Sequence, residues 1–259
     1  MNLGELITHL RDNILHDRSH QIAGAVSSYL WSDATLALYI NEAQRRLCRK
    51  AAVLRDGTNP EVTQFTTNEG TEFYPLHPSI LSVMSVRFDA DTVDLPRAGH
   101  SNLDTYQRSP SDPYFFDAST IAMLPPGKPR CFTTDEYLTL ADDSTLSVIN
   151  MRLWPTPDAD SSSKVVRMRV TRLPLNTLVA TNLEAVPEVP EEYHLQMLDW
   201  AAYLALRIVD IDGGQAQRAV EFRDSFNAYV EEINIETKGK LLQPVTIGFG
   251  RSGFAYERD

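Results

Sequence analysis

Residues 189–206 read VPEEYHLQMLDWAAYLAL, and this stretch decides the architecture expected of the whole chain. Its polar side chains fall at spacings of three and four, from Gln196 through Asp199 and Tyr203 to Arg207, and would form one narrow stripe on a helix. The rest of the helix surface is apolar. Because a helix that is apolar on most sides is normally buried, the stretch predicts a helix that needs cover on several sides.

Prolines precede this helix and glycines end it. Pro187 and Pro190 lie before its first turn, which carries two glutamates, and DIDGG at 210–214 breaks the pattern. A second amphipathic helix is expected from about 215 to 236. Together the two helices predict an antiparallel hairpin over residues 185–237.

Two further helical patterns lie in residues 1–59. Residues 3–15 place leucines and isoleucines on one side. A longer pattern follows Ser32, a good N-cap, and continues to Gly57. Since none of these helices can bury its apolar face alone, the N- and C-terminal helices are predicted to pack into one bundle. They look too short to cover the helix at 189–206 completely, which predicts a neighbouring subunit against it.

Residues 60–184 have the character of an antiparallel β domain. Seven segments combine β-branched and aromatic residues with polar alternation: EVTQFTT, EFYPL, ILSVMSVRF, PYFFDAS, PRCFTT, TLSVINMRLW and KVVRMRVTRL. PDADSSSK is the expected turn between the last two. The predicted fold class is therefore α+β: a helical bundle, an inserted antiparallel sandwich or barrel, and an extended C-terminal arm over 238–259.

Composition excludes several classes of protein. The chain has 259 residues and a net charge of −11, from 35 acidic and 24 basic side chains. It therefore lacks the basic footprint of a non-specific nucleic-acid-binding protein. No apolar run is long enough for a membrane span, and the N-terminus does not resemble a secretion signal. Cys48 and Cys131 are far apart in the sequence, which favours reduced thiols in a protein made in the cytoplasm and without a membrane partner.

No catalytic or metal motif is complete. The chain has no Gly-x-Ser-x-Gly elbow, His-Glu-x-x-His pair, phosphate loop or dinucleotide fingerprint. Glu191 and His194 have the spacing of a di-iron helix, but the second copy that such a site requires is missing, so we interpret them as surface residues of a first turn. Asp210 and Asp212 begin a calcium-loop pattern that lacks its glycine. We therefore predict a protein that is not an enzyme and holds no metal or cofactor.

Two basic groups stand out from the acidic background. The first, on the helix after Ser32, is Arg45, Arg46, Arg49 and Lys50. The second, on the predicted strands, is Arg152, Arg167, Arg169 and Arg172. Each could face DNA or an acidic partner. The alternative, which we favour, is a solvated helix end and the outer face of a sheet.

Two packing motifs resemble those of the head-to-tail adaptor (connector) proteins of tailed bacteriophages. Members of that family carry an Ile-Asn-x-Ala-Gln helix before a β insertion and a Tyr-His helix with a later Trp-Ala pair after it. The first motif is matched by Ile40, Asn41, Ala43, Gln44 and Leu47. The second is matched by Pro190, Tyr193, His194, Leu198, Trp200, Ala201, Ala205 and Leu206.

The resemblance implies a virion structural protein of the neck. Adaptors of this family form a ring, usually twelve-fold, beneath the portal, where the ring extends the DNA channel and docks the next tail or nozzle component. The implied partners are the portal protein, a tail or nozzle protein, further copies of the chain, and double-stranded DNA that passes through an acidic lumen without sequence-specific binding. Another neck or tail structural protein, or a metal-dependent hydrolase, is the alternative.

Two sets of residues are expected to make the contacts of such an assembly. The arm is too apolar for a solvated tail and too rich in glycine to fold alone, so it is expected to bind the portal or, failing that, a neighbouring subunit. Its anchors are Leu241, Leu242, Ile247, Phe249, Phe254 and Tyr256. The residues expected inside the bundle or between subunits are Tyr193, Leu198, Trp200 and Leu204.

Overall fold

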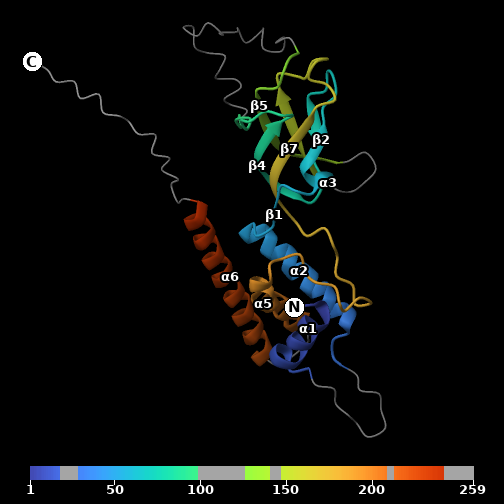
Figure 1. Cartoon of the computed structure of the whole chain (residues 1–259). Helices are drawn as coiled ribbons and strands as arrows, with labels where there is room; N and C mark the ends of the chain where they lie inside the picture. Colours follow the sequence, from blue (N-terminus) through green and yellow to red (C-terminus); the bar gives the residue numbers. More distant parts are fainter. Residues whose placement is uncertain (18–28, 99–125, 141–146, 209–212, 242–259) are drawn as a thin grey trace, which may run out of the picture.

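The computed structural model describes residues 1–17, 29–98, 126–140, 147–208 and 213–241. Figure 1 shows a β domain at one end of the molecule and a helical body at the other, with α6 along one side of the body. The predicted α+β class is confirmed, because the two ends of the sequence form helices and the part between them forms antiparallel sheets. Among the described helices, none has the length and apolar character that crossing a membrane requires.

The first helices begin at well-formed caps. Helix α1 (Leu3–His9) starts with a capping box in which Asn2 and Glu5 each accept the other's backbone N–H, and it continues into the π-helical segment η1 (Leu10–Leu15). Helix α2 (Asp33–Ala51) begins as predicted after Ser32, whose hydroxyl accepts the Thr35 N–H at 3.1 Å.

Helix α2 ends earlier than its sequence pattern predicts. Ala52 adopts a left-handed conformation with φ of 48°, and its N–H bonds to the carbonyl of Cys48. The expected end at Gly57 is therefore wrong. The chain instead forms the short strand β1 (Arg55–Asp56), because those two residues pair with the last strand of the β domain.

The β domain is a small sandwich of two antiparallel sheets. In the first, β7 (Val165–Arg172) is central, with β1 and β2 (Gln64–Thr66) along one edge and β4 (Ile80–Phe88) along the other. In the second, β6 (Ser147–Trp154) lies between β3 (Phe73–Pro75) and β5 (Cys131–Leu140). Residues 155–164 connect β6 to β7, in agreement with the predicted turn.

The alternation predicted for the last strand sets the core of this sandwich. Val166, Met168 and Val170 of β7 are buried, while Arg167 and Arg169 between them are exposed. The second sheet contributes fully buried side chains to the same cluster, which are Phe132, Met151 and Leu153. The inner faces of the two sheets therefore pack against each other.

One predicted strand is partly wrong, and another lies outside the described residues. Residues 61–67 do not form one strand, because Pro60–Thr63 form the short helix α3, which Asn59 caps by accepting the Glu61 N–H at 3.1 Å. The strand expected at 113–119 lies outside the described residues.

After β7 the chain returns to the helical body as a connector, residues 173–190, without regular secondary structure. Its backbone carbonyls at Leu183 and Ala185 accept the N–H groups of Gly4 and Leu3 at the start of α1. On α2, the Asn41 side chain bonds both the carbonyl and the N–H of Leu178, at 2.7 and 2.9 Å. The connector is thereby fastened to both N-terminal helices.

The helix quoted at the outset is the centre of the body. It begins with the 3₁₀ turn η3 (Glu191–Tyr193) and continues as α5 (His194–Ile208), and α6 (Gly213–Leu241) follows it. The two helices run antiparallel, since Tyr193 contacts Tyr229 and the later Asp199 contacts the earlier Ser225.

The chain itself covers α5. Helix α5 contacts α6, α2, η1 and α1, and six of its side chains are at most 3% exposed: Met197, Leu198, Ala201, Ala202, Ala205 and Leu206. Among the described side chains of α5, Leu195 and Arg207 are the exposed ones. The core around α5 is therefore completed within the chain, while Leu195 is 47% exposed and a contact of a neighbouring subunit with α5 stays a prediction.

We expect Asn41→Leu to destabilise the folded chain by about 2–4 kcal/mol, because the buried N–H and carbonyl of Leu178 would both lose their partner. Urea unfolding of the monomer measures the loss. Leu38→Ala is the matched control on the exposed side of α2, and its effect should stay within about 0.5 kcal/mol. Equal stabilities of the two variants would contradict this role of Asn41.

Candidate assembly surfaces

The first adaptor-like motif lies on the buried side of α2. Ile40, Ala43 and Leu47 are fully buried in the helical core, and Asn41 holds the connector. Gln44 is 1% exposed, and neither atom of its amide has a hydrogen-bond partner among the described residues. The motif therefore describes how α2 packs inside the chain.

His194 of the second motif is an internal connection and not a surface residue, so that expectation is wrong. Its ring is 1% exposed, with Nε2 at 2.8 Å from the Val189 carbonyl and Nδ1 at 3.3 Å from the amino group of Met1. That amino group also lies 3.0 Å from Glu191 Oε1. Burial and the nearby amino group lower the pKa of His194, although Val189 and Glu191 act in the opposite direction. A neutral ring fits these contacts, with its proton on Nε2.

Trp200 lies where α2, α5 and α6 meet. Its ring is 5.2 Å from that of Phe226 and 5.0 Å from that of Tyr203, and the Arg46 guanidinium lies 4.8 Å from its centre. Trp200, Tyr193 and Leu204 are half-buried against the core, and Leu198 is fully buried. These four expected contact residues therefore have places in the bundle of a single chain.

The four basic residues of α2 do not form one patch. Arg46 stacks on Trp200, and Lys50 donates to the Asn227 side chain at 3.3 Å while its carbonyl accepts from Asn234. Arg45 and Arg49 are exposed on the outer side of α2. Arg46 therefore belongs to the contact of α2 with α5 and Lys50 to the contact of α2 with α6, while Arg45 and Arg49 are available to a partner.

The four arginines predicted on strands also separate. Arg152 pairs with Glu72, and Arg167 donates to the carbonyl of Asp89. Arg169 is exposed on the outer face of the sheet, whereas Arg172 is half-buried beneath the β domain. The four arginines therefore do not form a single face that could bind DNA.

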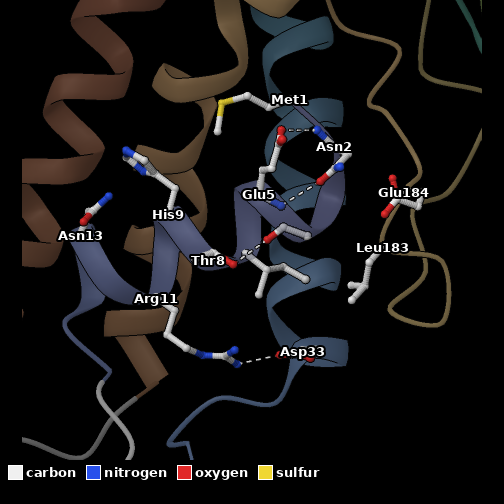
Figure 2. A pocket seen from close by; sticks show the side chains of 12 residues that line it. Met1, Asn2, Glu5, Thr8, His9, Arg11, Asn13, Asp33, Leu183 and Glu184 are labelled. Atoms are coloured by element: carbon white, nitrogen blue, oxygen red, sulfur yellow. Dashed lines mark hydrogen bonds and ion pairs between the residues drawn. The ribbon is translucent and has the colours of Figure 1, made fainter.

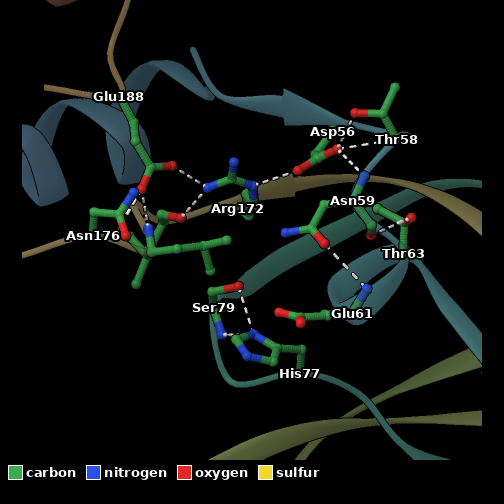
Figure 3. A network of polar contacts seen from close by, with 12 residues as sticks. Asp56, Thr58, Asn59, Glu61, Thr63, His77, Ser79, Arg172, Asn176 and Glu188 are labelled. Carbon is green, nitrogen blue, oxygen red and sulfur yellow. Dashed lines mark hydrogen bonds and ion pairs between the residues drawn. The ribbon is translucent and has the colours of Figure 1, made fainter. Parts of the chain in front are cut away.

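Arg172 connects the β domain to the helical body (Figure 3). Its guanidinium lies 2.8 Å from Asp56 Oδ2 and 2.6 Å from Glu188 Oε2. The second oxygen of Glu188 accepts the N–H groups of Leu175 and Asn176 at 2.8 and 2.6 Å. The cluster thus joins three passages of the chain: the segment after α2, the end of β7 and the connector. We refer to Asp56, Arg172 and Glu188 as the junction triad.

The acid of the junction triad next to β1 has a depressed pKa. Burial alone would raise the pKa of Asp56, but hydrogen bonds from the backbone of Thr58 and Asn59 and from Arg172 lower it to about 2. The side chain of Asp56 is 8% exposed, so solvent screens this interaction only weakly. The charged pair therefore favours the folded state at neutral pH.

A recess of about 600 Å³ lies along the outer side of α1 (Figure 2). The Arg11 cation inside it already bonds Asp33 and the Trp31 carbonyl, each at 2.8 Å. The Thr8 hydroxyl donates to Gly4, and His9 Nδ1 has no hydrogen-bond partner among the described residues. Within the described lining, these groups form no nucleophile–base pair of the kind that hydrolases use.

Neither cysteine has the depressed pKa of a reactive thiol. Cys48 is buried on α2, and burial raises the pKa of its thiol to about 12. Cys131 is partly buried, and its pKa is also raised by burial. Within the ranges that the structure describes, no group of three histidine, cysteine or carboxylate side chains could hold a metal ion.

Most of the expected arm lies outside the described residues. Helix α6 continues to Leu241, beyond its predicted end at residue 236, so Leu241 belongs to a helix and not to an extended arm. The other five expected anchors lie outside the described part of the chain: Leu242, Ile247, Phe249, Phe254 and Tyr256.

A protein-family model described as SU10 adaptor protein matches residues 1–247, which include the helical body and the β domain. No curated protein matches the chain.

For the junction triad we expect a pH-dependent loss of stability. A carboxyl group with a depressed folded-state pKa stabilises the protein above its unfolded-state pKa, and this contribution disappears as the pH falls from 3.8 towards about 2. Asp56→Asn should therefore be less stable than the wild type by about 2 kcal/mol at pH 7, and the difference should shrink below pH 4.

Urea unfolding at pH 7, 5 and 3 measures this difference. Asp91→Asn is the control, because its partner Lys128 is largely exposed and such pairs contribute at most about 1 kcal/mol. A difference between wild type and Asp56→Asn that stays constant over the whole pH range would contradict the role of the Asp56 charge.

Proposed function

The chain belongs to the SU10 adaptor family of phage head-tail adaptor proteins, and on this premise we propose that it forms a ring in the virion neck, between the portal and the tail. The observation that carries the proposal is the match over residues 1–247, since it includes both the bundle and the β domain. The proposed partners are the portal protein, a tail or nozzle protein and further copies of the same chain.

The architecture supports a structural role. The helical body has a closed core, and the junction triad fastens the β domain to it at a point where three passages of the chain meet. A subunit of this kind can transmit a fixed geometry from one end to the other, which a rigid ring component needs. The surface outside the core is then free for partners above, below and beside the subunit.

The charge of the chain supports a channel through which DNA passes without adhering. A net charge of −11 repels phosphates. In this proposal the lumen is acidic and DNA is a passing cargo with no sequence-specific contact.

The C-terminal segment is the proposed portal anchor. Residues 242–259 follow α6 and combine three glycines with five large apolar side chains. A segment of this composition gains order when it docks on a partner, and its aromatic residues are suited to serve as anchors. Because α6 is described to Leu241, a deletion that begins at residue 242 leaves the described helix intact.

We expect the full-length protein to bind the portal of the same phage as a ring that is visible by electron microscopy. Deletion of residues 242–259 should leave the melting temperature of the chain nearly unchanged and abolish this binding. Negative-stain images of portal mixed with each protein, together with thermal melting of both proteins, provide the measurement.

A full-length protein that leaves the portal undecorated and attaches elsewhere in the neck or tail would contradict the adaptor assignment. A truncated protein that still decorates the portal would show that the anchor lies elsewhere. A truncated protein that unfolds would place the segment in the chain's own core.

A further inference from the structure

Helix α2 presents an exposed face with positive charge. Leu38, Glu42, Arg45 and Arg49 follow one another at spacings of four, three and four, so they lie on one side of the helix. Leu38 is 63% exposed, and Arg45 and Arg49 are exposed as well. We call Leu38, Arg45 and Arg49 the basic face.

Helix α6 presents an exposed face with negative charge. Its buried residues, among them Phe226, Val230 and Ile233, point towards the core. The opposite side repeats at spacings of four and three through Gln217, Glu221, Asp224, Ala228, Glu231 and Ile235, all of them exposed. We call Glu221, Glu231 and Ile235 the acidic face, because Asp224 is already paired with Arg223 at 2.9 Å.

The pKa of Tyr229, which lies on α6 beside the acidic face, is raised in part by nearby carboxylates. Burial raises the pKa of Tyr229, and Glu192, Glu232 and Glu236 raise it further. A partner that docks along α6 therefore approaches a surface that favours cations.

We propose that the basic face of one copy of this chain docks on the acidic face of the next copy. Two chains of net charge −11 repel each other, so a stable contact between them has to bring cations against carboxylates. Arg45 and Arg49 lie four residues apart on one side of α2, and Glu221 and Glu231 lie ten residues apart on one side of α6, so each charged face runs along its helix, as helices that pack side by side require. Leu38 and Ile235, which is 71% exposed, supply apolar area beside the charges.

This pairing deepens the proposed function, on which it rests, by naming the contact between ring subunits. A contact between two different faces leaves one face free at each end, so its repetition builds a ring or a filament and not a closed dimer. DNA is a poorer occupant of the basic face than a protein helix, because the exposed apolar side chain of Leu38 would find no apolar partner on a phosphate backbone.

Charge exchange between the two faces tests the pairing. One full-length chain carries Arg45→Glu and Arg49→Glu, and a second carries Glu221→Arg and Glu231→Arg. Each chain alone places like charges across the contact and should assemble at least about tenfold more weakly than the wild type. An equal mixture restores opposite charges at every contact and should assemble like the wild type. Mass photometry measures the oligomer over a concentration series, with and without the portal of the same phage.

The matched control is Arg167→Glu with Arg169→Glu, which makes the same charge change on the β domain and should leave assembly unchanged. All the substituted residues of the two test chains are exposed, and circular dichroism checks that each chain is folded.

The outcomes separate the two proposals. If the wild type forms rings on the portal and each altered chain alone does the same, the pairing is overturned and the adaptor function stands. If the altered chains assemble only when mixed and no sample binds the portal, the pairing is supported and the adaptor function is overturned. A wild type that does not self-associate under either condition would overturn both. Normal assembly of the Arg45→Glu, Arg49→Glu chain with loss of DNA binding would assign the basic face to DNA and overturn the pairing.

Discussion

The packing of α5 against α2 is the constraint on which the rest of the structure depends. The two helices lie about 150 residues apart in the sequence, yet they share one core in which Ile40, Leu47 and Leu198 are completely buried. Burying each such side chain contributes roughly 1.5–3 kcal/mol, so the contact outweighs the cost of closing the chain around the β domain. The connector, the junction triad and α6 all take their positions from this pair.

Because the β domain is inserted between α2 and α5, its orientation on the helical body has to be fixed by contacts near the two points where the chain enters and leaves it. The chain leaves the body after α2 and returns at the end of β7, and Leu81 of β4 packs against the helical core beside these two passages. Arg172 bonds an acid from the outgoing passage and an acid from the returning connector. A buried ion pair of this kind contributes modest net stability, but the loss of either partner is costly, so it specifies one orientation of the domain.

Sequence periodicity predicted the helices and strands better than it predicted which residues distant in the sequence contact them. The cap at Ser32 and the alternation along β7 depend on nearby residues, and both are found as predicted. The end of α2, the junction triad and the contacts of His194 depend on residues that are distant in the sequence, and no local pattern contains them.

A core completed within one chain implies a subunit that folds completely before it assembles, and hydrogen exchange of the α5 amides tests this order most directly. At a concentration low enough to keep the protein monomeric, the amides of residues 198–206 should be strongly protected, and binding to the portal should leave their protection unchanged. Rapid exchange of these amides in the monomer, with protection gained only on assembly, would contradict the account, because a neighbouring subunit would then be needed to complete the core.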